Sequence, residues 1–187
     1  MNFPDHPFWD FAIGVYSAEG VSEACINLQE RHGLDVNVML FCLWVGHSGQ
    51  GALSEDEVMA ALAATDKWHR VVVKGLRLVR RTLKEGFDAA PEELRTQLRA
   101  QVQAAEIDAE HLQQSMLVTA LNDRRVNLED APIEERAANV VAGLGHYLRA
   151  IDAQFEPRDA VDFAHILGKS FADLKPDSAL DLSENLM

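Results

Sequence analysis

The residues GLDVNVMLFCLWVGH at positions 33–47 are the most apolar stretch of this chain and decide its fold. Gly33 is suited to end a helix, because glycine readily takes the left-handed conformation found at helix C-termini. Asp35 can cap the next helix through its side-chain oxygens. Residues 36–47 are apolar on nearly every side of that helix. A helix without a polar face has to be surrounded by other elements, so we expect it at the centre of the fold.

Outward from this central helix, the sequence predicts more helices and almost no strand. Ala, Leu, Glu, Gln and Arg dominate, and no alternating run of β-branched residues appears. Prolines at first helical positions, glycine stops and the capping box Ser54-Glu55-Asp56-Glu57 mark the helix ends. The expected helices cover residues 7–16, 21–32, 36–47, 55–64, 66–86, 91–121, 132–153 and 157–174. The prediction is all-α: a single-domain bundle of about eight helices over residues 1–174, several of them long and antiparallel, with a loosely ordered tail at 175–187.

Composition limits the classes of function. The chain has 187 residues and a net charge of −13, and this acidic balance makes nucleic acid an unfavoured partner. We expect Cys25 and Cys42 to be buried thiols, because free cysteine packs as a small apolar residue. The N-terminal residues lack a signal-peptide pattern, and residues 38–45, the longest apolar run, are far too few to cross a bilayer. We therefore expect a cytoplasmic protein that does not enter a membrane.

One segment opposes the acidic balance. Residues 67–84 carry seven Lys or Arg and no Asp or Glu, so the rest of the chain carries −20. Most of these cations recur every three or four residues, which places them along one side of a helix. We call this segment the basic helix. Its apolar residues, from Trp68 to Leu83, are expected to face the core.

The basic helix has two interpretations. Its cations can pair with the protein's own carboxylates, for example Glu106 and Glu110. Alternatively, it is a docking site for an acidic protein partner or an anionic small molecule, because the planar guanidinium of arginine binds carboxylates and phosphates through two hydrogen bonds. The candidate residues of that site are Lys74, Arg77, Arg80, Arg81 and Lys84.

A second candidate site combines indoles with polar groups. Asp10 stands in an aromatic helix, where an unpaired carboxylate is costly to bury. It is expected either to form a buried ion pair or to line a pocket with an arginine, as polar groups in small-molecule sites do. The other members of this set are Trp9, Asn37, Trp44 and Trp68.

Metal binding and catalysis have weaker signals. Three Asp-x-x-His pairs occur, and such pairs share one helix face, but the di-iron sites of helical bundles use glutamates instead. The pairs are Asp66/His69, Asp108/His111 and Asp162/His165. No nucleophile elbow, P-loop or dinucleotide fingerprint occurs. We therefore predict no cofactor and no catalytic residue.

The helix at 91–121 has a heptad-like apolar stripe that includes Leu94 and Leu98. This stripe is expected either to pack against an antiparallel neighbour within the bundle or to form the seam of a homodimer.

Several segments resemble a known family. They are Phe8-Trp9-Asp10-Phe11, Gly20-Val21-x-x-Ala24-Cys25, and Gly33-x-Asp35-Val36-Asn37 continuing to Leu40-Phe41-Cys42-Leu43-Trp44-x-Gly46. On these residues the chain resembles the bacterial DUF2390 family, and the similarity extends through residues 68–84, 109–110, 138–139 and 147–148. The resemblance implies a small helical protein of the bacterial cytoplasm and implies no activity.

From the residues themselves, the leading hypothesis is a non-enzymatic binding or adaptor protein that uses the basic helix. The alternative is a ligand-binding protein or enzyme with a pocket lined by Trp9, Asp10, Asn37, Trp44 and an arginine.

Overall fold

The computed structural model describes the whole chain except residues 1–2, 4–5, 86, 88 and 122–130. The described residues form helices and no strand, which confirms the all-α prediction. The predicted end of the basic helix at residue 86 lies outside the described residues. The helices are α1 Pro7–Tyr16, α2 Val21–His32, α3 Val36–His47, α4 Glu55–Trp68, the π-helix η1 His69–Val73, α5 Lys74–Glu85, α6 Glu92–Ala120, α7 Ile133–Ala150, α8 Pro157–Ser170 and α9 Pro176–Glu184.

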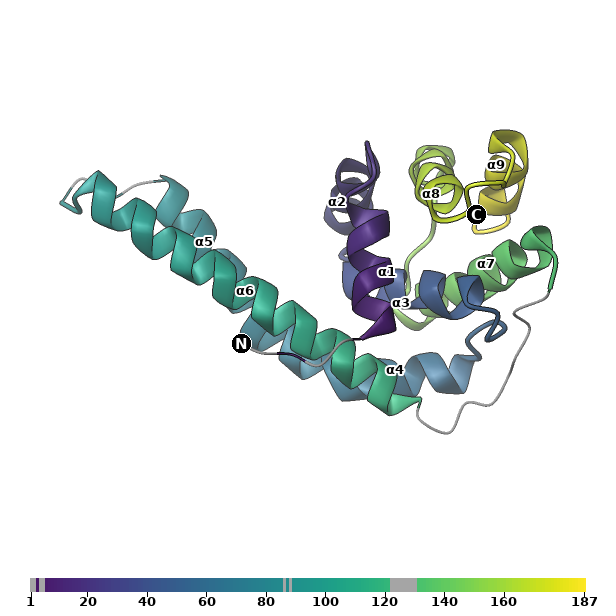
Figure 1. The fold of residues 1–187 in the computed structure, drawn as a ribbon, viewed down its shortest axis with the longest axis horizontal. Helices are drawn as coiled ribbons and strands as arrows, with labels where there is room; N and C mark the ends of the chain where they lie inside the picture. The colour runs from purple at the N-terminus through teal and green to yellow at the C-terminus, as the bar shows by residue number, and fades with distance from the viewer. Residues whose placement is uncertain (1–2, 4–5, 86, 88, 122–130) are drawn as a thin grey trace.

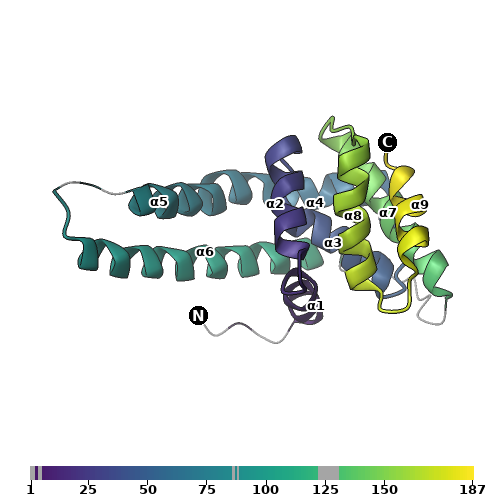
Figure 2. The same cartoon turned by 90° about the horizontal axis from the view of Figure 1, so that it is seen from above.

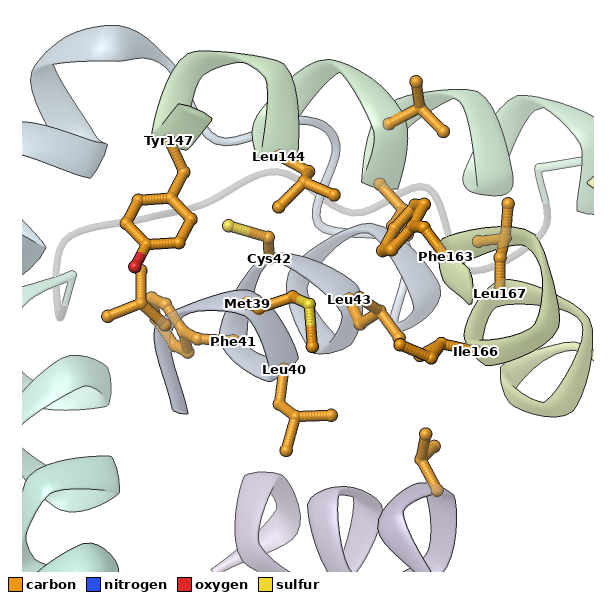
Figure 3. Close-up of a cluster of buried hydrophobic side chains, with 14 of the residues drawn as sticks. Met39, Leu40, Phe41, Cys42, Leu43, Leu144, Tyr147, Phe163, Ile166 and Leu167 are labelled. Carbon is orange, nitrogen blue, oxygen red and sulfur yellow. The ribbon is translucent and has the colours of Figure 1, made fainter. Parts of the chain in front are cut away.

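Helix α3 occupies the centre of the fold, as the apolar stretch predicts. Its residues from Val38 to Leu43 are all buried, and α1, α2, α6, α7 and α8 pack around it. Figure 3 shows this cluster, in which side chains from α7 and α8 meet those of α3. Asp35 caps the helix by accepting a hydrogen bond from the backbone N–H of Asn37 at 2.9 Å. The free thiols of Cys25 and Cys42 are buried, as expected.

Helices α3 and α7 approach each other closely at Gly46. A Cβ added there would lie 2.5 Å from Cγ2 and 2.6 Å from the backbone nitrogen of Val140. Only a residue without a side chain fits, since backbone atoms cannot move aside as a flexible side chain can. Gly46 therefore sets how tightly α7 packs on the central helix.

The basic helix is continuous with the helix before it, so the expected break between helices at 55–64 and 66–86 is wrong. Helices α4, η1 and α5 follow one another without interruption. The Thr65 hydroxyl donates to the Ala61 carbonyl inside the helix, and the Asp66 carboxylate accepts from Arg70 one turn later. Neither Gly nor Pro stands near residue 65 to stop the helix.

The far end of this rod projects from the body together with the first half of α6. Figures 1 and 2 show these two antiparallel helices, which we call the arm, extending away from the remaining helices. The expectation that the apolar side of the basic helix faces the core is therefore wrong. Helix α5 has no buried residue, Leu78 is 66 % exposed, and Val71 in the adjoining π-helix is 64 % exposed. The outer members of the α6 stripe, Leu94 and Leu98, are exposed as well.

The C-terminal segment is also more ordered than the sequence reading predicts. In place of a loose tail at 175–187, helix α9 packs on α8 and α7. Ala179 and Leu182 of this helix, and Leu186 just beyond its end, belong to or pack against the core. None of the described helices is both long and apolar enough to cross a lipid bilayer.

Candidate functional site

A cavity of about 460 Å³ lies where the root of the arm meets the body. Helices α1, α2 and α3 form one side of it, and η1, α5 and α6 form the other. Its size is in the usual range for small-molecule sites. The structure brings together members of both candidate sites that the sequence predicts. Trp9 and Asn37 from one site line the cavity, and so do the three candidate arginines of the basic helix.

The cavity has a closed end with several polar side chains and an open mouth that combines large apolar side chains with a few polar ones. The lining residues Asp35, Asn37, His69 and Gln114 are all at least nine-tenths buried. The exposed lining residues, which mark the mouth, include the large apolar side chains Ile13, Tyr16, Ile26 and Ile107. A molecule that entered would pass apolar walls before it reached the polar end.

A chain of side-chain hydrogen bonds crosses the closed end. Gln114 Nε2 donates to Asn37 Oδ1 at 2.8 Å, and Asn37 Nδ2 donates to Gln113 Oε1 at 3.3 Å. Gln113 Nε2 then donates to the carboxylate of Asp35. We call this chain the amide relay. All four residues are buried, so the relay is shielded from bulk water.

The relay has a fixed direction because an ionised carboxylate can only accept hydrogen bonds. Asp35 therefore requires the NH₂ group of Gln113, which turns the Gln113 oxygen toward Asn37 and the Asn37 oxygen toward Gln114. Gln114, the last member, uses its NH₂ group to donate to Asn37, so the relay does not use its carbonyl oxygen. This Oε1 atom is buried and has no hydrogen-bond partner among the described residues.

Asp35 also contacts His69, the first residue of the π-helix. His69 Nδ1 lies 3.0 Å from Asp35 Oδ2, although the ring is not aligned for a hydrogen bond. The carboxylate favours the tautomer with its proton on Nδ1, because two lone pairs would otherwise face each other. His69 Nε2 is buried without a partner among the described residues. Short π-helical segments such as η1 are frequent at functional sites.

Two of the three arginines that line the cavity are paired internally. Arg77 donates to Glu106 at 2.9 Å, to Glu110 at 2.7 Å and to Gln29 at 2.8 Å, and Arg80 pairs with Glu106. Burial raises the pKa of Glu106, but hydrogen bonds from Arg80 and Arg77 outweigh it, and the pKa lies below its ordinary value. Burial raises the pKa of Glu110, and Arg77 only partly opposes this shift.

The third arginine, Arg81, differs from the other two. It lines the cavity, its side chain is exposed, and none of the described residues forms an ion pair or hydrogen bond with it. Lys74 and Lys84 are exposed too, but they do not line the cavity. The mouth therefore holds one cation whose charge is not neutralised by an adjacent described carboxylate.

The other residues of the second candidate site, Asp10, Trp44 and Trp68, do not line the cavity. Asp10 is exposed and does not line the cavity, because the buried residues of α1 are Phe8, Ala12 and Val15, on another side of the helix. Trp44 stacks on Phe8 in the core with ring centroids 5.4 Å apart. Trp68 donates from Nε1 to the carbonyl oxygen of Ala109 at 2.9 Å. The predicted burial of Asp10 is thus wrong.

The three Asp-x-x-His pairs do not form sites. His69 contacts Asp35, His165 bonds the carbonyl oxygen of Glu19, and Asp162 pairs with Arg31. The His111 ring stacks between Phe3 and Trp9, and burial lowers its pKa. In the part of the chain that the structure describes, no group of three or more His, Cys, Asp or Glu residues could hold a metal ion.

The sequence reading misses Gln113, Gln114 and Gln29 as site residues. Their signal is weak, because glutamine is common on solvated helices and only the packing of α6 against α1 and α3 buries the first two. Adjacent glutamines facing the buried half of a long helix are the pattern that could have identified them.

Comparison with known proteins identifies one family. A family model described as "Protein of unknown function (DUF2390)" matches residues 7–117. The match covers every residue that lines the cavity, from Trp9 to Gln114. The similarity expected at residues 138–139 and 147–148 lies outside it. No curated protein and no solved structure matches the chain.

Proposed function

The chain belongs to the DUF2390 family of proteins of unknown function, and we propose that it is a binding protein whose cavity holds an elongated small molecule with an apolar body and an anionic end. The observation that carries this proposal is Arg81. Its guanidinium, which has no ion-pair partner among the described residues, stands at the mouth of a cavity whose other two arginines are neutralised by Glu106 and Glu110.

The ligand's apolar body follows from the walls. Trp9, Ile13, Tyr16 and Ile107 present aromatic and aliphatic surface to the cavity. A planar or rod-shaped hydrocarbon would cover this surface and gain the free energy of its burial. Its carboxylate or phosphate would remain near the solvent, where Arg81 can bind it through two hydrogen bonds.

Titration calorimetry with biphenyl-4-carboxylate tests the proposal. We expect binding to the wild type, and weaker binding of the neutral isostere biphenyl-4-carboxamide. Arg81→Glu should weaken carboxylate binding by about tenfold or more, because a charge-assisted hydrogen bond contributes roughly 1.5–3 kcal/mol. Lys84→Glu is the matched control, since it makes the same charge change on an exposed residue of α5 that does not line the cavity. No binding to the wild type, or equal losses in both variants, would contradict the proposal.

A second candidate function is docking of an acidic protein along the basic helix. It is favoured by the exposure of Lys74, Arg81 and Lys84 on one projecting helix. Such docking would use all three cations, so Lys84→Glu and Arg81→Glu should weaken binding of poly-L-glutamate alike, with strong dependence on salt. A homodimer through the exposed residues Leu94 and Leu98 remains a further proposal for the arm, checked by the protein's mass in solution.

We also propose that the protein works in the cytoplasm. Its two free, buried cysteines suit a reducing compartment.

A further inference from the structure

We infer that the closed end of the cavity recognises a hydrogen-bond-donor head, an ammonium or hydroxyl group, so that the ligand is a bipolar molecule with its donor head inside and its anionic group at the mouth. This inference rests on the proposed function. It comes from the two neighbours of Asp35, the amide relay and His69, each of which has a buried side-chain atom without a partner among the described residues and lines the cavity.

The first acceptor is Gln114 Oε1, and the amide relay determines its identity. Each amide in the relay is oriented by the next, and Asp35 orients the last one. If the Gln114 amide were rotated by 180°, its oxygen instead of its NH₂ group would face Asn37 Oδ1. Two acceptor oxygens would then repel each other. Gln114 therefore offers an acceptor and not a donor.

The second acceptor is His69 Nε2. In the tautomer that carries its proton on Nδ1, on the side of Asp35, the ring has a lone pair on Nε2. Both His69 and Gln114 line the cavity, and both unpaired atoms are buried. Leaving a buried acceptor unsatisfied is unfavourable, so a ligand donor that pairs with either atom recovers free energy on binding.

Charge supports the same polarity. The closed end holds the buried carboxylate of Asp35, whereas the mouth holds Arg81, which no described carboxylate neutralises. A ligand with a cationic or donor head inside and an anionic group outside matches both. Residues 69 and 81 are twelve positions apart on one uninterrupted rod, about 18 Å at the usual helical rise. The ligand must therefore be elongated, because the Arg81 side chain spans only part of that length.

Two probes that differ only at the inner end test the inference. They are 4′-(aminomethyl)biphenyl-4-carboxylate and 4′-methylbiphenyl-4-carboxylate, measured by titration calorimetry at the same pH. The wild type should bind the aminomethyl probe at least about tenfold more tightly, which corresponds to one recovered hydrogen bond to a charged group. A preference smaller than threefold would overturn the inference.

Three variants locate the preference. Asp35→Asn keeps the cap of α3 but removes the group that directs the relay, so the preference should fall below threefold while the methyl probe still binds. Gln114→Met removes the acceptor directly and should do the same. Gln103→Met, an exposed lining residue of the same helix, is the control and should leave the preference intact.

The outcomes separate the two proposals. If both probes bind equally and depend on Arg81, the proposed function stands and the inference on the donor head is wrong. If neither probe binds the wild type, both are wrong. A preference that survives Asp35→Asn and Gln114→Met would also overturn the inference, because it would then arise elsewhere in the cavity. Circular dichroism melting of each variant shows which ones are folded and can be compared.

Discussion

The carboxylate of Asp35 lies 3.0 Å from the imidazole of His69. This contact joins the start of the central helix α3 to the π-helix η1 within the basic helix. Asp35 is held on other sides as well. Its backbone N–H donates to the Tyr147 hydroxyl at 2.8 Å, and its side chain caps α3 and receives Gln113. The closed end of the cavity is thus built on the first turn of the helix that forms the core.

This position should be sensitive to the loss of its carboxyl oxygens. We predict that Asp35→Ala lowers the free energy of unfolding by roughly 2–4 kcal/mol, because it removes a helix cap and leaves Gln113 without an acceptor. Asp35→Asn should cost less than about 1 kcal/mol, since asparagine caps helices equally well. Urea denaturation monitored by circular dichroism checks both values. An alanine variant as stable as the wild type would show that Asp35 does not hold this end together.

A pair of glycine substitutions tests the packing of α7 on α3. Gly46→Ala should lower the free energy of unfolding by about 3 kcal/mol, because its Cβ would overlap backbone atoms of Val140. Gly14→Ala, in α1, meets nothing within 4 Å and should raise stability by roughly 0.5–1 kcal/mol through the better helix propensity of alanine. Both are measured by thermal and urea unfolding. Equal effects at the two sites would contradict the close approach of α7.

The boundaries of the first three helices follow from local signals. Pro7, Gly33 and Asp35 act within one turn of the residues that they start or stop, so α1, α2 and α3 begin and end where the sequence predicts. The continuous rod and the arm could not be found this way. His69 in this helix lies beside Asp35, which is far away in the sequence, and no local pattern around Asp66 contains that contact.

The candidate site was partly predictable, because some of its residues stand out in the sequence while others are recognised only through contacts made in the fold. Arginines and a tryptophan are conspicuous in a sequence, and Trp9, Asn37, Arg77, Arg80 and Arg81 do line the cavity. The inner polar groups are ordinary glutamines that only the fold buries. Asp10 is an error in the other direction. Its aromatic neighbours in the sequence indicate that it is buried, but it lies on the exposed side of α1.

Acid should weaken the ion cluster between α2 and α8. Burial raises the pKa of Asp159, but the Glu156 backbone N–H and the side chains of His32 and Arg31 outweigh it, so the pKa lies below its ordinary value. The ionised Asp159 therefore stabilises the folded protein above the pKa of the unfolded state, about 4. This stabilisation is lost as the pH falls through the lower pKa of the folded state.

Asp159→Asn should therefore lower the free energy of unfolding at pH 7 by roughly 3–5 kcal/mol, the usual effect of breaking a buried pair. The difference from the wild type should shrink as the pH falls below about 4. Urea unfolding across this pH range gives the measurement. Asp173→Asn, at an exposed position, should change stability by less than about 0.5 kcal/mol and serves as the control. A difference independent of pH would argue against an ionised Asp159 in the folded protein.

The two cysteines should react only after unfolding. Burial raises the pKa of Cys25 and of Cys42 to about 12, so almost no thiolate is present near neutral pH. We predict negligible release of thionitrobenzoate from Ellman's reagent by the folded protein at pH 8, and reaction of both thiols in guanidinium chloride. Rapid reaction of either cysteine in the native protein would show that its helix is not packed as described.

The tryptophans provide the most direct test of the cavity as a binding site. Trp9 lines it, whereas Trp44 is packed in the core and the Trp68 indole N–H is bonded to Ala109. A titration of ¹⁵N-labelled protein with biphenyl-4-carboxylate, followed through the three indole N–H signals, separates these positions. The account predicts a saturable shift of the Trp9 signal while those of Trp44 and Trp68 stay in place. A Trp9 signal that does not move, or equal shifts of all three, would contradict it.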